Sequence, residues 1–148
     1  MTRINLVDPK ELADQHVFAE WREIKMVPAA LKRSLKSKNP HQVINSIPKE
    51  FTLNKGHVTF FYDKMQYLSD RYELLSEELR LRGFRKDLEW NNFAEYCEGI
   101  PSVFFKSYDP SPNALTIIRE RIRERIGMKP HWYKYYSTSI MDVDGFKI

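Results

Sequence analysis

Four polar side chains of different chemistry recur near the start of the chain. At the helical spacing of about 100° per residue, Gln15, His16, Arg22 and Glu23 gather on one face. An amide, an imidazole, a guanidinium and a carboxylate held close together can bind an anion and move a proton. The alternative is a solvated helix face without a chemical role. The spacing alone leaves both interpretations open.

The element that must position these side chains is a helix predicted over residues 9–25. Asp8 can accept hydrogen bonds from early backbone N–H groups, Pro9 fits the first helical position, and Glu11 completes an acidic capping box. A second stripe of this helix is apolar and is expected to pack against the core; it consists of Ala13, Val17, Trp21 and Ile24.

Three further segments have helical periodicity. The spacing predicts a short helix over residues 28–36, a central helix over 59–82 that ends at Gly83, and a last helix over 109–126 with Gly127 as its left-handed cap. The apolar residues expected to be buried are Phe61, Met65, Leu68, Tyr72, Leu75 and Leu79 in the central helix, and Leu115, Ile118, Ile122 and Ile126 in the last one.

The rest of the chain is expected to form loops. Residues 84–108 have weak periodicity and read as a long surface connection, with a short helix around residues 88–96. The sequence therefore predicts an all-α fold, a single compact domain of about three main helices with long connecting loops. This domain covers residues 1–136, and a loosely held C-terminal extension follows over 137–148.

Aromatic residues are dense in two places. Those of residues 60–67 are interpreted as core, because they lie on the periodic stripe. The block HWYKYY at 131–136 can stack on bases, grip a sugar-phosphate backbone or seal the core against the first helix. Four arginines of the last helix, Arg119, Arg121, Arg123 and Arg125, are spaced so that Glu120 and Glu124 can pair with some of them.

Composition narrows the classes of protein. The net charge is +4, and residues 22–55 hold eight Lys or Arg against two acidic residues, which favours a surface for a polyanion. Cys97 is the one cysteine and the four histidines are scattered, so neither a disulfide framework nor a metal site is expected. The sequence lacks an apolar run of eighteen residues and the plan of a signal peptide, so we expect a soluble intracellular protein without membrane contact.

The chain resembles the pyrimidine-dimer DNA glycosylase/AP lyases of phages and algal viruses, often called the dimer-specific endonuclease V. The blocks that carry the resemblance are MTRINL, ELADQH and AEWRE in the first 23 residues, GHVTFFYDK at 56–64, LRGF at 81–84 and WYKYY at 132–136. They occur in the same order and at compatible spacing, over nearly the whole chain.

The resemblance implies a repair enzyme that needs no cofactor. Its nucleophile would be the amine of Thr2 after removal of Met1, and Glu23 would stabilise the cationic intermediate and take part in proton transfer. An α-amine with a pKa near ~7.8 is roughly 15% neutral at pH 7, against about 0.04% for an ordinary lysine. The amine attacks C1′ of the sugar, and the resulting Schiff base permits β-elimination at the abasic site.

The resemblance also implies a set of DNA contacts: Arg3, Gln15, His16, Arg22, Lys25, Arg125, Trp132 and Lys134. The expected partner is double-stranded DNA that contains pyrimidine dimers or abasic sites, bound by a monomer in a virus-infected host cell. In this family the base opposite the lesion swings out of the helix. Relatives often carry an arginine where this chain has Met26, so the phosphate contact of that arginine is not carried over.

Two other classes compete with this interpretation. A helical DNA-binding protein could keep the same scaffold without the reaction, and borohydride trapping on abasic-site DNA separates it from the enzyme. A metal-dependent nuclease would need a cluster of carboxylates or an HExxH-like motif, which the sequence lacks.

Overall fold

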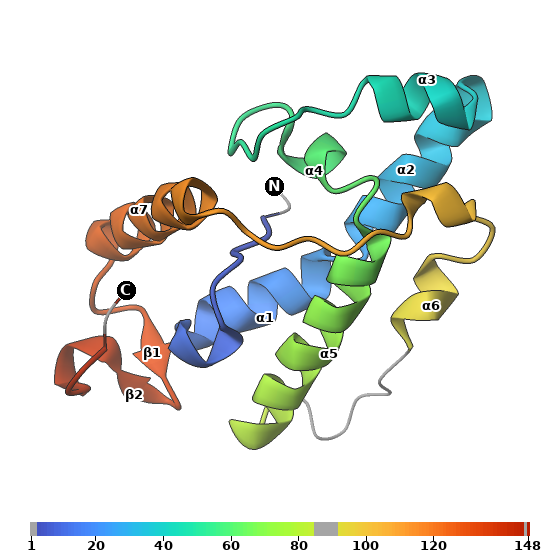
Figure 1. The fold of residues 1–148 in the computed structure, drawn as a ribbon. Coiled ribbons are helices and arrows are strands. Elements are labelled where there is room, and N and C mark those ends of the chain that lie inside the picture. The colour runs from blue at the N-terminus through green and yellow to red at the C-terminus, as the bar shows by residue number, and fades with distance from the viewer. Residues whose placement is uncertain (1–2, 85–91, 147) are drawn as a thin grey trace.

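The structure is a computed structural model and describes residues 3–84, 92–146 and 148. The helices are α1 (Asp14–Glu23), α2 (Met26–Ser37), α3 (Pro40–Asn45), α4 (His57–Phe60), α5 (Met65–Leu81), α6 (Phe93–Tyr96) and α7 (Pro112–Met128) (Figure 1). Strands β1 (Lys134–Tyr135) and β2 (Thr138–Ser139) form a short antiparallel hairpin. The predicted all-α class is confirmed. In the part of the chain described, no helix is long and apolar enough to cross a membrane.

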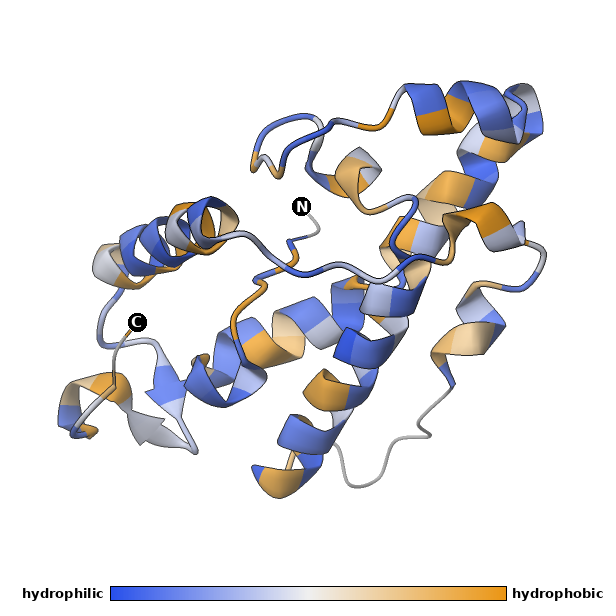
Figure 2. Ribbon diagram, viewed as in Figure 1, coloured by the Kyte–Doolittle hydropathy of each residue, from blue (hydrophilic) through white to orange (hydrophobic). Residues whose placement is uncertain are grey.

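Helices α1 and α5 cross at the centre of the molecule and bury the apolar stripes predicted for them. All six residues of the central stripe are buried, as are Val17 of α1 and the residues that flank this helix, Ala13 and Ile24. Figure 2 shows hydrophobic residues recurring between hydrophilic ones along α5. Trp21 is only partly buried, and its indole N–H donates to the Ser76 hydroxyl on α5 at 3.1 Å. Burial on one side of each helix therefore holds the scaffold together.

The first helix is shorter than predicted. Asp8 accepts a hydrogen bond from the Lys10 N–H, but this caps only a 3-10 turn over Pro9–Glu11. Leu12 and Ala13 are extended, with ψ angles of 148° and 155°, so α1 begins at Asp14. The predicted capping box is wrong, because the Glu11 carboxylate forms an ion pair with Arg119 of α7 at 3.2 Å. The Glu11 carboxylate, which the predicted capping box required, is thus engaged in a contact with another helix.

The predicted central helix is two helices. The chain leaves helical geometry between α4 and α5, where the Lys106 N–H donates to the Asp63 carbonyl at 3.2 Å and the Tyr67 N–H donates to the Lys106 carbonyl at 3.3 Å. The backbone of residues 63–67 is thus paired with a strand-like segment forty residues later, which no periodicity predicts. The end of α5 is as expected, since Gly83 has a left-handed φ of 82°.

The last helix starts and ends later than predicted. Ser111 caps α7 by accepting a hydrogen bond from the Ala114 N–H at 3.1 Å. Gly127 lies inside the helix without a left-handed φ, so the predicted glycine cap is wrong. Three of the four residues predicted on its buried side, Ile118, Ile122 and Ile126, are buried. Of the short helix expected around 88–96, α6 covers 93–96, and residues 88–91 lie outside the described part of the chain.

The C-terminal extension is packed, contrary to the expectation of a loosely held tail. Ile140 and Ile148 are buried, and the Ile140 N–H donates to the Tyr133 carbonyl at 3.1 Å. The hairpin turn that leads into it has left-handed φ values at Tyr136 and Ser137, and both N–H groups donate to the Asp14 carboxylate, at 2.9 and 2.8 Å. The extension is therefore fixed to the first turn of α1.

A buried cluster of charges holds this junction together, and we refer to it as the Arg82 cluster. The Arg82 guanidinium donates to Glu78 at 3.0 Å, to Asp14 at 2.9 Å and to the Pro9 carbonyl at 3.0 Å. It also lies 4.8 Å from the ring centroids of both Tyr135 and Tyr136. The Tyr136 hydroxyl completes the cluster by donating to Glu78 at 2.7 Å.

Candidate nucleic-acid interface and active site

The N-terminal segment runs between α1 and α7 toward α4 (Figure 1). Although it is extended, its backbone is held by side chains. The Ile4 N–H donates to Nε2 of His57 at 2.9 Å, and the Asn5 N–H donates to the Glu20 carboxylate at 3.1 Å. Leu6 has a φ of 59°, rare for a residue with a side chain, and turns the chain back toward α1. These contacts fix the start of the described chain beside α1.

A cleft of about 330 Å³ opens where this segment, α1, α7 and the HWYKYY block meet. One wall consists of Arg3, Asn5, Gln15, His16, Ala19, Glu20 and Glu23, and the other of Arg121, Ile122, Arg125, Trp132 and Tyr133. The structure therefore brings together six residues singled out in the sequence. They are Arg3, Gln15, His16, Glu23, Arg125 and Trp132.

The cleft carries an excess of positive charge. Burial and the neighbouring charges of Arg121 and Arg125 lower the pKa of the Arg3 guanidinium, so these three cations are close enough to repel one another. Arg121 pairs with Glu124 at 3.3 Å, yet its Nε is buried without a hydrogen-bond partner. Arg125 is exposed and makes no ion pair with any residue that the structure describes. Such a group of cations suits an anion such as a phosphate.

The His16 ring packs at a tilt against Tyr133 of the opposite wall. Its ring centroid lies 4.8 Å from that of Tyr133, and burial, with a smaller effect from Arg125, lowers the pKa of His16 to about 4. Its Nδ1 is buried and has no hydrogen-bond partner in the structure. At neutral pH this imidazole can therefore accept or donate one hydrogen bond without adding charge.

Glu23 supplies the accessible carboxylate of the cleft. Its side chain is 23% exposed, and the Arg22 guanidinium approaches to 3.9 Å from the solvent side. The other carboxylate, Glu20, is committed to structure, because its side chain pairs with buried Arg71 through both oxygens. Of the two acids in the cleft, Glu23 is therefore the one available for proton transfer.

Gln15 joins the two walls. Its amide nitrogen donates to the Trp132 carbonyl at 2.7 Å, and its amide oxygen accepts from the Lys134 N–H at 3.0 Å. Trp132 itself is 55% exposed at the rim. The sequence left the role of the aromatic block open. In the structure its residues have different environments: Tyr133 is buried under the cleft, while Tyr135 and Tyr136 contact Arg82.

Three residues predicted for the site do not line the cleft, and a fourth lies outside the described residues. Arg22 lies next to Glu23 but is not part of either wall. The Lys25 ammonium lies 5.8 Å from the Tyr96 ring of α6, and Lys134 is an exposed strand residue. Thr2, the predicted nucleophile, lies outside the described residues. Met26, where relatives often carry an arginine, begins α2 and is 52% exposed.

The sequence interpretation missed several residues of the cleft, chiefly Arg121 and Glu20. Arg121 was assigned to pairing within its helix, but its position four residues before Arg125 places both on the cleft side of α7. That spacing was the available signal. For Glu20 there was none, because its partner Arg71 is 51 residues away in the chain.

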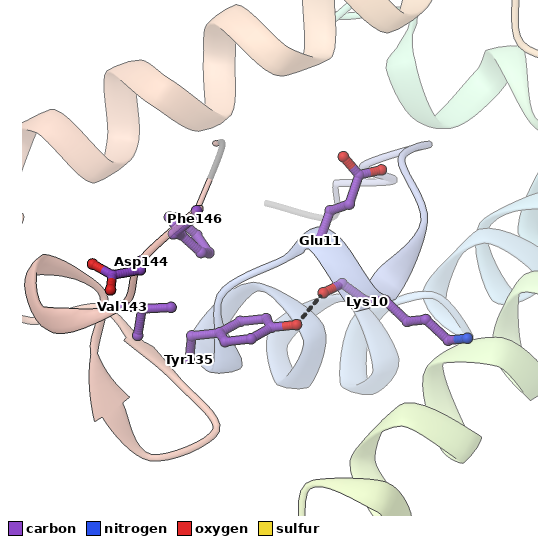
Figure 3. Close-up of a pocket in the computed structure, with 7 residues that line it drawn as sticks. Lys10, Glu11, Tyr135, Val143, Asp144 and Phe146 are labelled. Carbon is purple, nitrogen blue, oxygen red and sulfur yellow. Dashed lines mark hydrogen bonds between the residues drawn. The ribbon is translucent and has the colours of Figure 1, made fainter.

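A second hollow lies beside the C-terminal extension, and it has fewer side chains that could act together on a ligand. In Figure 3 the Tyr135 hydroxyl donates to the Lys10 carbonyl, while the charged ends of Lys10 and Asp144 point away from one another. Its polar groups do not converge on a common point. Among the described residues, no group of three His, Cys, Asp or Glu could hold a metal ion.

Comparison with known protein families identifies the scaffold. The model of a family described as pyrimidine dimer DNA glycosylase matches residues 1–92. The match includes the N-terminal segment, α1 and α5, and thus one complete wall of the cleft with Glu23. The other wall, on α7 and the aromatic block, follows the matched region. The chain therefore belongs to the family of pyrimidine dimer DNA glycosylases.

Proposed function

We propose that this protein cleaves the glycosidic bond at pyrimidine dimers through a Schiff base formed by its N-terminal amine, and that it nicks the resulting abasic site by β-elimination. The observation that carries the proposal is the cleft, where the first described residue, Arg3, shares a wall with Glu23 and faces two further arginines. Arg3 and Ile4, the two residues that follow the proposed nucleophile in the sequence, are held by hydrogen bonds to Leu53 and His57.

The proposed reaction has two stages. The neutral amine forms a bond to C1′ as the bond from C1′ to the pyrimidine breaks; the base takes the bonding electrons, accepts a proton from solvent and stays attached to its neighbour through the dimer. One proton of the new amine moves to the sugar oxygen O4′ as the bond from C1′ to O4′ breaks, and the Glu23 carboxylate stabilises the protonated Schiff base that remains. Loss of a C2′ proton then expels the 3′ phosphate and breaks the strand, with Glu23 taking part in the proton transfer. Neutral His16 is available to orient the sugar or Glu23 by a hydrogen bond.

The arginines on both walls of the cleft support the binding step. In this proposal Arg3, Arg121 and Arg125 contact phosphates, and the exposed Trp132 stacks on a base. Arg22, Lys25 and Lys134 can add contacts outside the cleft. We further propose that the enzyme acts as a monomer and accepts preformed abasic sites. The affinity for DNA should fall steeply as the salt concentration rises. An affinity that does not change with salt would contradict the proposed phosphate contacts.

The deciding experiment is borohydride trapping on DNA that contains one abasic site. Wild-type protein, shown by mass to lack Met1, should become covalently linked to the DNA through Thr2. Acetylation of the N-terminus should abolish the link, because an amide is not nucleophilic. Glu23→Gln should still be trapped while strand scission falls by roughly 10²- to 10⁴-fold.

The controls separate this proposal from a protein that only binds. Glu23→Gln should retain its affinity for DNA that contains a tetrahydrofuran abasic analogue, which cannot form a Schiff base. A wild-type protein that binds the analogue but is never trapped would be a non-catalytic DNA-binding protein, and the proposed chemistry would be wrong.

A further inference from the structure

The block GHVTFFYDK contains a buried histidine that the proposed mechanism does not use. His57 is 2% exposed and lines neither the cleft nor the neighbouring hollow beside Arg3. Its Nε2 accepts from the Ile4 N–H at 2.9 Å, and its Nδ1 lies 2.8 Å from the Thr52 carbonyl. Since the carbonyl can only accept, Nδ1 carries the proton, and Nε2 presents its lone pair to Ile4.

The surroundings of His57 prevent the ring from turning away. Phe51 and Phe61 pack edge-on against it, each with ring centroids 5.4 Å from that of the imidazole. The residue before it is Gly56, where a Cβ would come within 2.9 Å of the Pro48 side chain, so a residue with a side chain does not fit here without a shift of its neighbours. Burial lowers the pKa of His57 to about 4, against the opposing effect of the Thr52 hydrogen bond and with a further lowering by Arg3. The acceptor is therefore present at neutral pH.

The same loop also holds the residue before Ile4. The Arg3 guanidinium donates to the Leu53 carbonyl at 3.2 Å, so residues 3 and 4 are both tied to residues 53–57. On the other side, Asn5 is tied to Glu20. An extended segment usually satisfies its backbone groups with a neighbouring strand. Here individual side chains do so, and each hydrogen bond fixes one residue in position.

We infer that His57 is a positioning residue for the N-terminal amine: its neutral imidazole fixes the Ile4 backbone and thereby sets where the chain start reaches into the cleft. This inference rests on the proposed function, because the amine matters only if it attacks the sugar. Holding the nucleophile in place accelerates the bimolecular step, and small displacements are costly. His57 does not line the cleft, so it acts through the N-terminal segment.

Two substitutions of similar size separate the two hydrogen bonds of His57. His57→Asn keeps a donor that can reach the Thr52 carbonyl but has no acceptor at the position of Nε2. His57→Gln places a side-chain oxygen near that position. Ser76→Ala is a control that removes a hydrogen bond from Trp21 of α1, on the α5 side and outside the cleft.

The rate of Schiff-base trapping at saturating abasic-site DNA should fall on the order of 10- to 100-fold in His57→Asn. His57→Gln should recover most of the rate, and Ser76→Ala should match the wild type. Affinity for the tetrahydrofuran analogue should stay within about threefold in all three. A merely structural role would lower affinity and trapping together, in proportion to the folded fraction. Wild-type trapping by His57→Asn would overturn the inference.

Hydrogen exchange of the Ile4 amide provides a readout that needs no catalysis. Exchange should accelerate strongly in His57→Asn, while amides of α5 keep their protection. If wild-type protein is not trapped by borohydride, the proposed function fails, and this exchange experiment still decides whether His57 holds the segment. Unchanged exchange at Ile4 would contradict the positioning role.

Discussion

Two clusters of arginines, carboxylates and aromatic rings adjoin the same helix, and their chemistry differs. The Arg82 cluster joins the start of α1 to Tyr135 and Tyr136, and the cleft joins the following turns of α1 to Trp132 and Tyr133. In the first, all three guanidinium nitrogens of Arg82 have partners. In the second, the Arg121 Nε and the His16 Nδ1 have none.

The difference indicates that the Arg82 cluster stabilises the fold and that the cleft is suited to binding a ligand. Buried polar groups are nearly always paired, so two unpaired buried atoms in residues that line an open cleft distinguish the cleft from the fully paired Arg82 cluster. Three cations near one another destabilise the free protein slightly and favour binding of a polyanion. The Arg82 cluster has no such excess, because Asp14 and Glu78 surround its single cation.

The same substitution made in both clusters should give the largest contrast. Arg82→Met leaves two carboxylates without their cation in a buried position, and the free energy of unfolding should drop by about 3–5 kcal/mol. Arg125→Met removes an exposed and unpaired cation, so stability should stay within about 0.5 kcal/mol. Urea unfolding of the two variants and the wild type measures both values. Equal losses would contradict the distinction between the clusters.

The dependence of stability on pH should reveal the lowered pKa values of His16 and His57. The pKa values of His16 and His57 are lowered to about 4, so below pH 6.5 the unfolded chain binds protons that the native protein does not. Stability should therefore fall between pH 6.5 and about 4, by up to about 3 kcal/mol per histidine.

The cleft histidine can be tested separately by comparing wild type with His16→Asn. The variant should lose less stability between pH 7 and pH 4.5 in urea titrations, since one of the two histidine contributions is gone. The Arg82 cluster contains no histidine, so Tyr135→Phe should leave the slope as in the wild type. Identical slopes for wild type and His16→Asn would show that His16 does not resist protonation.

The smallest expected effect concerns affinity. Arg121→Met and Arg125→Met should each weaken DNA binding about tenfold, roughly 1.4 kcal/mol, and reduce the slope of log affinity against log salt by about one. Arg82→Met should leave this slope unchanged for the folded fraction. Fluorescence anisotropy at several salt concentrations measures both quantities, and an unchanged slope in the α7 variants would remove those arginines from the interface.

Periodicity predicted the helices well wherever burial decides the structure. The stripe of α5 and the polar face of α1 are where the spacing placed them, and Glu23, Gln15 and His16 accordingly reach one cleft. The failures share one cause. Glu11, Asp63 and Tyr67 bond to residues far along the chain, and those bonds end or interrupt helices that local propensity would continue.

The candidate site was predictable in part for the same reason. The family resemblance pointed to Glu23, Arg125 and Trp132 together, although they are up to more than a hundred residues apart. Helical periodicity relates only residues of the same helix, so it could not group them. Arg121 could have been predicted from helical periodicity, since it lies four residues before Arg125 on the same face of the helix. His57, Glu20 and Arg71 were not predictable, because their roles depend on long-range hydrogen bonds between otherwise ordinary residues.

Gln15 reaches across 117 residues of sequence to bind the Trp132 carbonyl and so closes the cleft. In a partly folded polypeptide, Glu23 on α1 and Arg121 and Arg125 on α7 are not held together. The positively charged cleft therefore forms only when the first helix and the aromatic block have docked on one another.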